Sequence, residues 1–147
     1  MEPLFHDILV AVDGSEPSLE AIQLALRIAA LCPECKITAL YVIDKLVLNE
    51  LARFSARSHA EVQAELEEQG QKYLELASQQ AQRQGIAIAC QTQQGDPFEQ
   101  IVAAANRLHA DLIAMGHTGR RGTSRVLIGS VTQRVLDYAP CPVLVMK

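Results

Sequence analysis

Glycine and hydroxyl residues recur near the end of the chain at a spacing that suits a phosphate group. Gly116 and Gly119 follow the apolar run 111–115, and Gly129-Ser130 comes after nine further residues. Glycine lacks a Cβ atom, so the backbone can turn tightly and bring its N–H groups close to an anion. Gly129-Ser130 also opens a periodic segment over 130–138, and a helix N-terminus offers free N–H donors and partial positive charge. The spacing predicts that both glycine pairs hold one triphosphate.

Each half of this pattern also has a purely structural explanation. Glycine after a strand is common in strand-to-helix connections, and Ser130 with Gln133 three residues later matches a helix capping box. Position favours a ligand, because 111–115 is typical of a buried strand and open α/β sheets bind ligands beyond the carboxyl ends of their strands.

The segments that must position these glycines alternate between two kinds. Apolar runs predict strands over 7–12, 36–43, 86–93, 111–115 and within 140–147. Periodic apolar residues predict helices over 15–29, from 62 to near Gly85, over 97–108 and over 130–138; Ser15 with Pro17 and Asp96 with Pro97 and Glu99 mark two of the helix starts. The alternation predicts an α/β protein with one doubly wound open sandwich, a five-stranded parallel sheet and helices on both faces. With no visible boundary, 1–147 is expected to be a single nucleotide-binding domain.

Asp13 directly follows the first predicted strand, 7–12. A carboxylate next to a polyphosphate is repelled unless it binds a sugar hydroxyl, an adenine amino group or a divalent cation. Asp13-Gly14-Ser15 equally matches a simple turn into the first helix. The residues alone leave both interpretations open.

Several motifs, in order, resemble the universal stress protein family. Gly116-x-x-Gly119, nine residues and Gly129-Ser130 resemble the family's nucleotide signature, and 7–15 resembles its first strand with the aspartate that ends it. The segments 40–44 and 140–147 resemble its second and closing strands, so the resemblance covers the whole chain. It implies the strand order 3-2-1-4-5, which would place Asp13 and Gly116 on facing sides of the switch-point crevice.

The resemblance further implies membership of the ATP-binding subgroup and a set of contacts. Ala11, Asp13 and Val42 would contact the adenosine, and Met115 would help to wall the base. The ribose and phosphates would be held by main-chain N–H groups and hydroxyls of Gly116, Gly119, Gly129, Ser130, Val131 and Thr132. ATP with Mg²⁺ is the expected ligand, with AMP and a cyclic nucleotide as alternatives.

Three arginines, Arg120, Arg121 and Arg125, lie between the glycine pairs. Guanidinium groups can neutralise phosphate or remain solvated. We expect Arg120 or Arg125 to contact the phosphate tail.

Motifs for fast chemistry are missing from the sequence. It has no Gly-x-x-x-x-Gly-Lys-[Ser/Thr] loop, Gly-x-Gly-x-x-Gly fingerprint, nucleophile elbow or His-Glu-x-x-His pair. We therefore expect no catalytic residues and a binding module; any ATP hydrolysis should be slow, with Mg²⁺ on the phosphates and Asp13 nearby.

Cys32 and Cys35 have the spacing of redox and zinc sites. They follow the first predicted helix, whose negative end disfavours a thiolate, and a zinc ion would need two more ligands. With Cys90 on a strand expected to be buried and Cys141 before the last strand, we expect reduced thiols and no metal site.

Segment 44–58 and the last predicted strand suggest roles beyond the nucleotide contacts. In segment 44–58, Leu48, Leu51 and Phe54 have near-helical spacing beside the adenosine site, which fits a lid helix and packing filler equally. The family resemblance implies a homodimer through the last strand, where Val143 and Val145 give an apolar edge.

Net charge and composition limit the partners and the cellular location that we expect. The 147 residues carry a formal net charge of −4, which argues against broad nucleic-acid or anionic-membrane binding. No basic, apolar leader or run of bilayer length is present, so a cytoplasmic location is expected. The resulting hypothesis is a stress-response module that presents its nucleotide state to an unknown protein partner. The alternatives are a nucleotide-independent dimeric interaction module and a slow ATPase.

Overall fold

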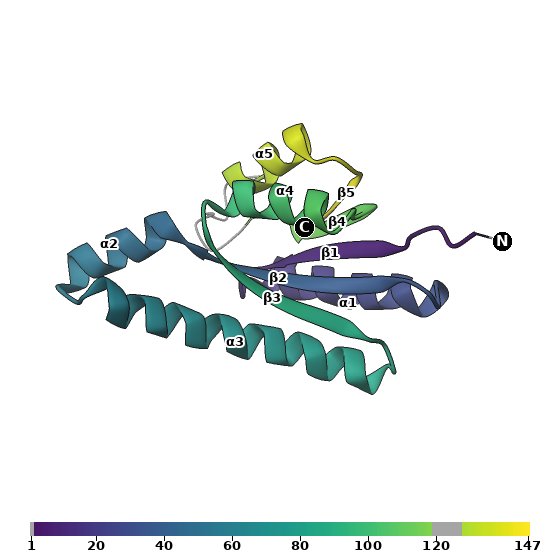
Figure 1. The fold of residues 1–147 in the computed structure, drawn as a ribbon, viewed down its shortest axis with the longest axis horizontal. Coiled ribbons are helices and arrows are strands. Elements are labelled where there is room, and N and C mark those ends of the chain that lie inside the picture. Colours follow the sequence, from purple (N-terminus) through teal and green to yellow (C-terminus); the bar gives the residue numbers. More distant parts are fainter. Residues whose placement is uncertain (1, 119–127) are drawn as a thin grey trace.

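A parallel sheet of five strands runs through the molecule in the order β3-β2-β1-β4-β5 (Figure 1). The computed structural model describes residues 2–118 and 128–147. Strands and helices follow one another as β1 (Asp7–Val12), α1 (Glu16–Leu31), β2 (Lys36–Asp44), α2 (Lys45–Ser55), α3 (His59–Arg83), β3 (Ile88–Gly95), α4 (Pro97–Arg107), β4 (Leu112–Gly116), α5 (Ser130–Tyr138) and β5 (Val143–Met146). The doubly wound α/β fold and its strand order are thus confirmed.

Helices cover both faces of the sheet, α1 and α3 on one side and α4 and α5 on the other (Figure 1). Along β1, Ile8 and Val10 join the apolar cluster under α1 and α3, whereas Leu9 joins the cluster under α4 and α5. These three side chains are at most 1% exposed. Burial on both faces explains why a parallel strand is a continuous apolar run in the sequence.

The helix starts expected from the sequence are present. Ser15 caps α1 by accepting the Ser18 N–H at 3.3 Å, and Asp96 caps α4 by accepting the Glu99 N–H at 3.2 Å. Strand β3 begins two residues later than predicted, because the Ile86 N–H closes the end of α3 on the Ala81 carbonyl at 2.9 Å.

The strand order places the ends of β1 and β4 side by side. Val10 pairs with Ala114, and Gly116 pairs with Met146 of β5. The chain leaves β1 for α1 on one face, while α5, which comes after β4, lies on the other. Asp13 and Gly116 therefore meet at a topological switch point.

Within the described residues, no helix is long and apolar enough to cross a bilayer.

Candidate functional site

A cavity of about 920 Å³ opens at the carboxyl edge of the sheet. This volume lies within the range of small-molecule sites. Its wall includes every described member of the predicted nucleotide set, namely Ala11, Asp13, Val42, Met115, Gly116, Gly129, Ser130, Val131 and Thr132. The predicted contacts of Gly119, Arg120 and Arg125 lie outside the described residues.

The N-terminus of α5 lines this cavity. Gly129 is its N-cap, with φ −69° and ψ 159°, and Ser130 is its exposed first residue. The capping-box interpretation of Ser130 and Gln133 is therefore wrong. The first bond within the helix runs from the Gln133 N–H to the Gly129 carbonyl at 2.9 Å. The N–H groups of residues 130–132 precede that bond and have no acceptor within the helix.

Two predicted phosphate ligands also hold the site together. The Gly129 N–H donates to the His117 carbonyl at 2.6 Å, and the buried Thr132 Oγ1 donates to the Gly116 carbonyl at 2.8 Å. Both donors are thus engaged with the end of β4. The groups at this helix end that can reach an anion without breaking these bonds are the Ser130 and Val131 N–H groups, the Thr132 N–H and the Ser130 hydroxyl.

Gly116 has a packing reason for lacking a side chain. A Cβ atom there would lie 2.7 Å from Pro17 Cβ and 3.2 Å from the Ser18 nitrogen. The first turn of α1 therefore rests directly on the end of β4. This contact brings the Asp13 turn and the α5 end to the same cavity.

Asp13 lies in a turn that fixes its carboxylate. Its Oδ1 accepts the Ser15 N–H at 2.9 Å, and its own N–H donates to Ser18 Oγ at 3.4 Å. The turn interpretation is therefore confirmed. Because the half-buried side chain also lines the cavity, the turn leaves it placed where a ligand contact is possible, and that contact stays a prediction.

An aromatic pair that the sequence analysis missed supports this turn. The rings of Tyr41 and Tyr73 have centroids 6.1 Å apart. The Tyr73 ring lies against Gly14, where an added Cβ would come within 2.3 Å of the ring. The Tyr41 ring lies against Gly70 of α3, where an added Cβ would come within 2.2 Å of the ring. A tyrosine three residues after a mid-helix glycine was the signal in the sequence.

Helix α2 continues the cavity wall beyond the end of β2. Val47 and Leu51 line the cavity, while Leu48 and Ala52 are buried in the apolar cluster shared with α3. The helix expected in this segment is present, with one side packed and the other facing the cavity, and its role as a lid stays a prediction.

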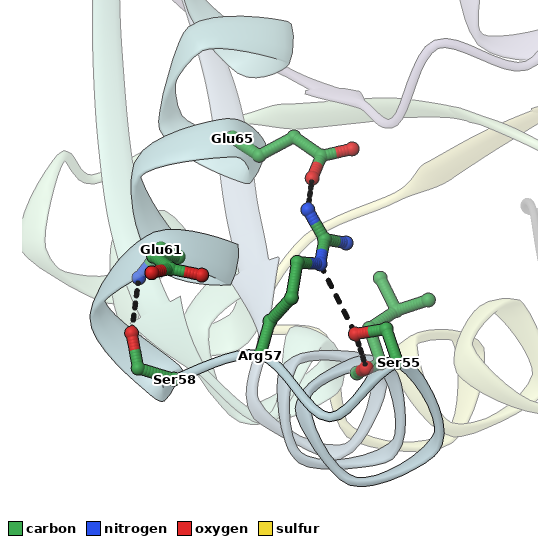
Figure 2. A network of polar contacts seen from close by, with 6 residues as sticks. Ser55, Arg57, Ser58, Glu61 and Glu65 are labelled. Atoms are coloured by element: carbon green, nitrogen blue, oxygen red, sulfur yellow. Dashed lines mark hydrogen bonds and ion pairs between the residues drawn. The ribbon is translucent and has the colours of Figure 1, made fainter.

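Figure 2 shows the polar network that fixes the corner between α2 and α3. Arg57 pairs with Glu65 of α3, and its Nε donates to Ser55 Oγ at 3.1 Å. Ser58 caps α3 by accepting the Glu61 N–H at 3.2 Å. Glu65 also lines the cavity, so this ion pair ties the position of α2 to the cavity wall.

The described wall combines acidic side chains with a helix N-terminus. The carboxylates of Asp13, Asp44 and Glu65 line it, and among described residues no lysine or arginine does. The N-terminus of α5 is an electropositive feature of this wall. The wall suits a ligand that carries both a phosphate and hydroxyl or amino donors.

The cysteine pair lies at the opposite edge of the sheet. Cys32 caps the C-terminus of α1, and the Cys35 N–H donates to its carbonyl at 2.8 Å. Burial, with a smaller contribution from the nearby Cys32, raises the pKa of the Cys35 thiol to about 11, which disfavours the reactive thiolate. Cys90 is exposed, because β3 is an edge strand, and the expectation that it is buried is wrong. No group of three potential metal ligands occurs in the part of the chain that the structure describes.

Comparison with known proteins decides the family. The profile of the universal stress protein family matches residues 4–147. The chain belongs to the universal stress protein family.

Relatives of this universal stress protein match along most of its length. Universal stress protein MJ0531 of Methanocaldococcus jannaschii is 38% identical over 147 residues, covering 99% of this chain and 84% of that protein. YxiE of Bacillus subtilis is 28% identical over 149 residues, covering 98% and 100%. Among solved structures, hypothetical protein MJ0577 superposes with a TM-score of 0.86 at 27% identity, covering 98% of this chain and 96% of the other. UspA of Lactobacillus plantarum superposes with a TM-score of 0.76 at 28% identity, covering 97% of each chain.

Proposed function

We propose that this universal stress protein binds ATP with Mg²⁺ across the carboxyl edge of its sheet and acts as a regulatory module in the stress response. The phosphates would bind at the N–H groups of residues 130–132, and the adenosine would lie between Ala11, Asp13, Val42 and Met115. The observation that carries the proposal is the open N-terminus of α5, which shares one cavity with the Asp13 carboxylate.

The charge of the site favours a nucleotide that brings its own cation. Mg²⁺ is usually held by one or two carboxylates together with substrate phosphates rather than by a cage of protein ligands. Asp13 would supply such a carboxylate, or would accept a hydrogen bond from the ribose. A contact from Arg120 or Arg125 to the phosphates remains part of the proposal.

Two solved proteins of this fold contain adenine nucleotides. One is a universal stress protein in complex with cAMP, and the other is the Arabidopsis thaliana protein At3g01520 with AMP bound. At 23% and 21% identity they resemble this chain in fold alone. The proposal for ATP therefore depends on the residues of this chain, and AMP and cAMP belong among the ligands tested.

The regulatory part of the proposal concerns assembly. Strand β5 pairs with β4 along one side and forms an edge of the sheet, and its Val143 and Val145 are half-buried. We propose a homodimer through this edge in the cytoplasm, with 1–147 acting as one domain and the nucleotide state altering the surface that a protein partner meets. Val145→Lys should convert the dimer to a monomer in analytical ultracentrifugation; an unchanged dimer would exclude this edge.

Calorimetric titration with ATP and Mg²⁺ tests the nucleotide site. Gly116→Val is unsuitable as a probe, because its side chain would collide with Pro17. Ser130→Glu is better, since a carboxylate in the first turn of a helix stabilises the helix but repels a phosphate. At about 5 Å and an effective dielectric constant near 20, one pair of charges repels by about 3 kcal/mol, or roughly a hundredfold in affinity.

Ser130→Gln is the matched control, because it has the same size without the charge. We expect ATP binding to be lost in Ser130→Glu and largely kept in Ser130→Gln, with the melting temperature of both close to that of the native protein. Saturable binding to the native protein that both variants retain would place the phosphates elsewhere. Absence of binding to the native protein would leave the nucleotide-independent interaction module.

A further inference from the structure

His117 connects three elements, β4, β5 and α5, at the end of β4. Its backbone N–H and its ring Nδ1 both bond the carbonyl of Met146, at 2.6 and 3.0 Å. Its own carbonyl accepts the Gly129 N–H at 2.6 Å. One residue thus connects the last carbonyl of β5 to the N-cap of α5.

The contact with Met146 determines where the ring proton lies. A carbonyl oxygen accepts hydrogen bonds and donates none, so Nδ1 must carry the proton whenever this bond is made. In the neutral ring this is the Nδ1–H tautomer. The ring is half-buried at the end of β4, next to the last pair of the β4–β5 ladder, Gly116 and Met146.

The helix donors lie immediately beyond this connection. The Ser130 and Val131 N–H groups are one and two residues past Gly129, whose position the His117 carbonyl fixes. Hydrogen bonds weaken steeply when donors tilt, so the helix end must be held in place before a phosphate arrives. The ring of His117 adds a second bond to Met146 of β5, beside the bond that the His117 backbone N–H makes.

We propose that His117 is a positioning residue that fixes the anion-binding end of α5 against the edge strand β5, so that phosphate binding and the order of β5 are coupled. The inference builds on the proposed nucleotide site and names a regulation of that site. Coupling of this kind is reciprocal: whatever stabilises β5 strengthens phosphate binding, and phosphate binding protects β5.

Two variants separate the ring bond from the space that the ring fills. His117→Asn places an amide nitrogen near the position of Nδ1 and can still donate to Met146. His117→Leu fills similar space without a donor. Each protein is titrated with ATP and with adenosine, which lacks the phosphates, and hydrogen–deuterium exchange is followed on the amides of residues 143–146 with and without ATP.

The loss of one neutral hydrogen bond corresponds to about a three- to tenfold change. We expect His117→Leu to weaken ATP binding by this factor with adenosine binding unchanged, and His117→Asn to bind ATP within about twofold of the native protein. ATP should slow exchange of the β5 amides in the native protein and in His117→Asn, but not in His117→Leu. A purely structural role would shift adenosine and ATP binding together.

Equal ATP affinity and equal ATP-dependent protection of β5 in the native protein and His117→Leu would overturn the inference while leaving the nucleotide site intact. Failure of the native protein to bind ATP would instead overturn the proposed function itself, and the coupling with it. If His117→Leu does not fold, His117→Gln replaces it, because its amide extends one carbon too far to match Nδ1, and the same expectations apply.

Discussion

Gly70 lies inside α3 and faces the ring of Tyr41, and replacing it with alanine should reveal how tightly the helix packs on β2. An alanine in a helix interior is normally about 1 kcal/mol more favourable than a glycine. At this position the added Cβ would lie 2.2 and 2.3 Å from two atoms of the Tyr41 ring. Distances this short require the ring or the helix to move.

The size of the effect follows from what surrounds the ring. Tyr41 is 5% exposed and packs against Tyr73, so its ring has little room to retreat. Overpacking a close-packed core costs typically 1–3 kcal/mol, and we take the upper end. Subtracting the propensity gain, we expect Gly70→Ala to lower the free energy of unfolding by about 2 kcal/mol.

A double-mutant cycle tests this estimate, because the effect of Gly70→Ala on the free energy of unfolding should change sign when the Tyr41 ring is removed. In a Tyr41→Ala background the ring is gone, so the same Gly70→Ala change should raise the free energy of unfolding by about 1 kcal/mol. Urea denaturation of the four proteins at one protein concentration measures both steps. A neutral or stabilising Gly70→Ala in the native background, or an equal effect in both backgrounds, would refute the packing argument.

Three further predictions concern backbone conformation, a buried bond and a thiol. Gly14→Ala should lower the free energy of unfolding by about 3 kcal/mol, because it combines a φ of +82° with a clash against Tyr73. Gly85→Ala, at φ +68° with no atom within 4 Å, should lower it by only about 1 kcal/mol. Similar losses of melting temperature in both variants would contradict this. Thr132→Val should lower the free energy of unfolding by about 1–2 kcal/mol in urea, because it leaves the carbonyl that its hydroxyl now bonds without that donor, and an unchanged midpoint would contradict it. The folded-state pKa of the Cys35 thiol is raised, so the contribution of this thiol to folding stability is complete below pH 9 and is lost, by about 2–3 kcal/mol, as pH rises toward 11. Cys35→Ala should therefore flatten the fall of stability over this pH range. An equally steep fall in the variant would assign the pH dependence to other groups.

Patterns of local origin could be predicted well from the sequence. The caps at Ser15 and Asp96 depend only on residues within one helical turn. The buried strands can be recognised in the sequence as continuous apolar runs. The strand order came from the family resemblance, since apolar runs alone do not say which strands are neighbours. The location of the cavity then followed from the topology of the sheet.

Contacts between distant residues were beyond sequence reasoning. Nothing in the spacing shows that Gly116 must accommodate Pro17, or that Thr132 donates to a carbonyl sixteen positions earlier. The cap of α5 was misplaced because Ser130 is a good capping residue by type, while the actual N-cap, Gly129, is held through its N–H by His117. The start of α5 is thus set by a tertiary hydrogen bond and not by the capping preference of the local residues.

The proposed phosphate contacts at the start of α5 come from the peptide backbone, and this has a practical consequence for anyone mapping the site. An alanine scan removes side chains and leaves every N–H of residues 130–132 in place, so it would pass over these donors almost silently. Replacing single peptide bonds by esters, which deletes one N–H at a time and keeps the side chain, would expose them. The same logic implies that residues 130 and 131 can vary widely in type, provided that they carry no negative charge and leave the backbone N–H groups within reach of a ligand.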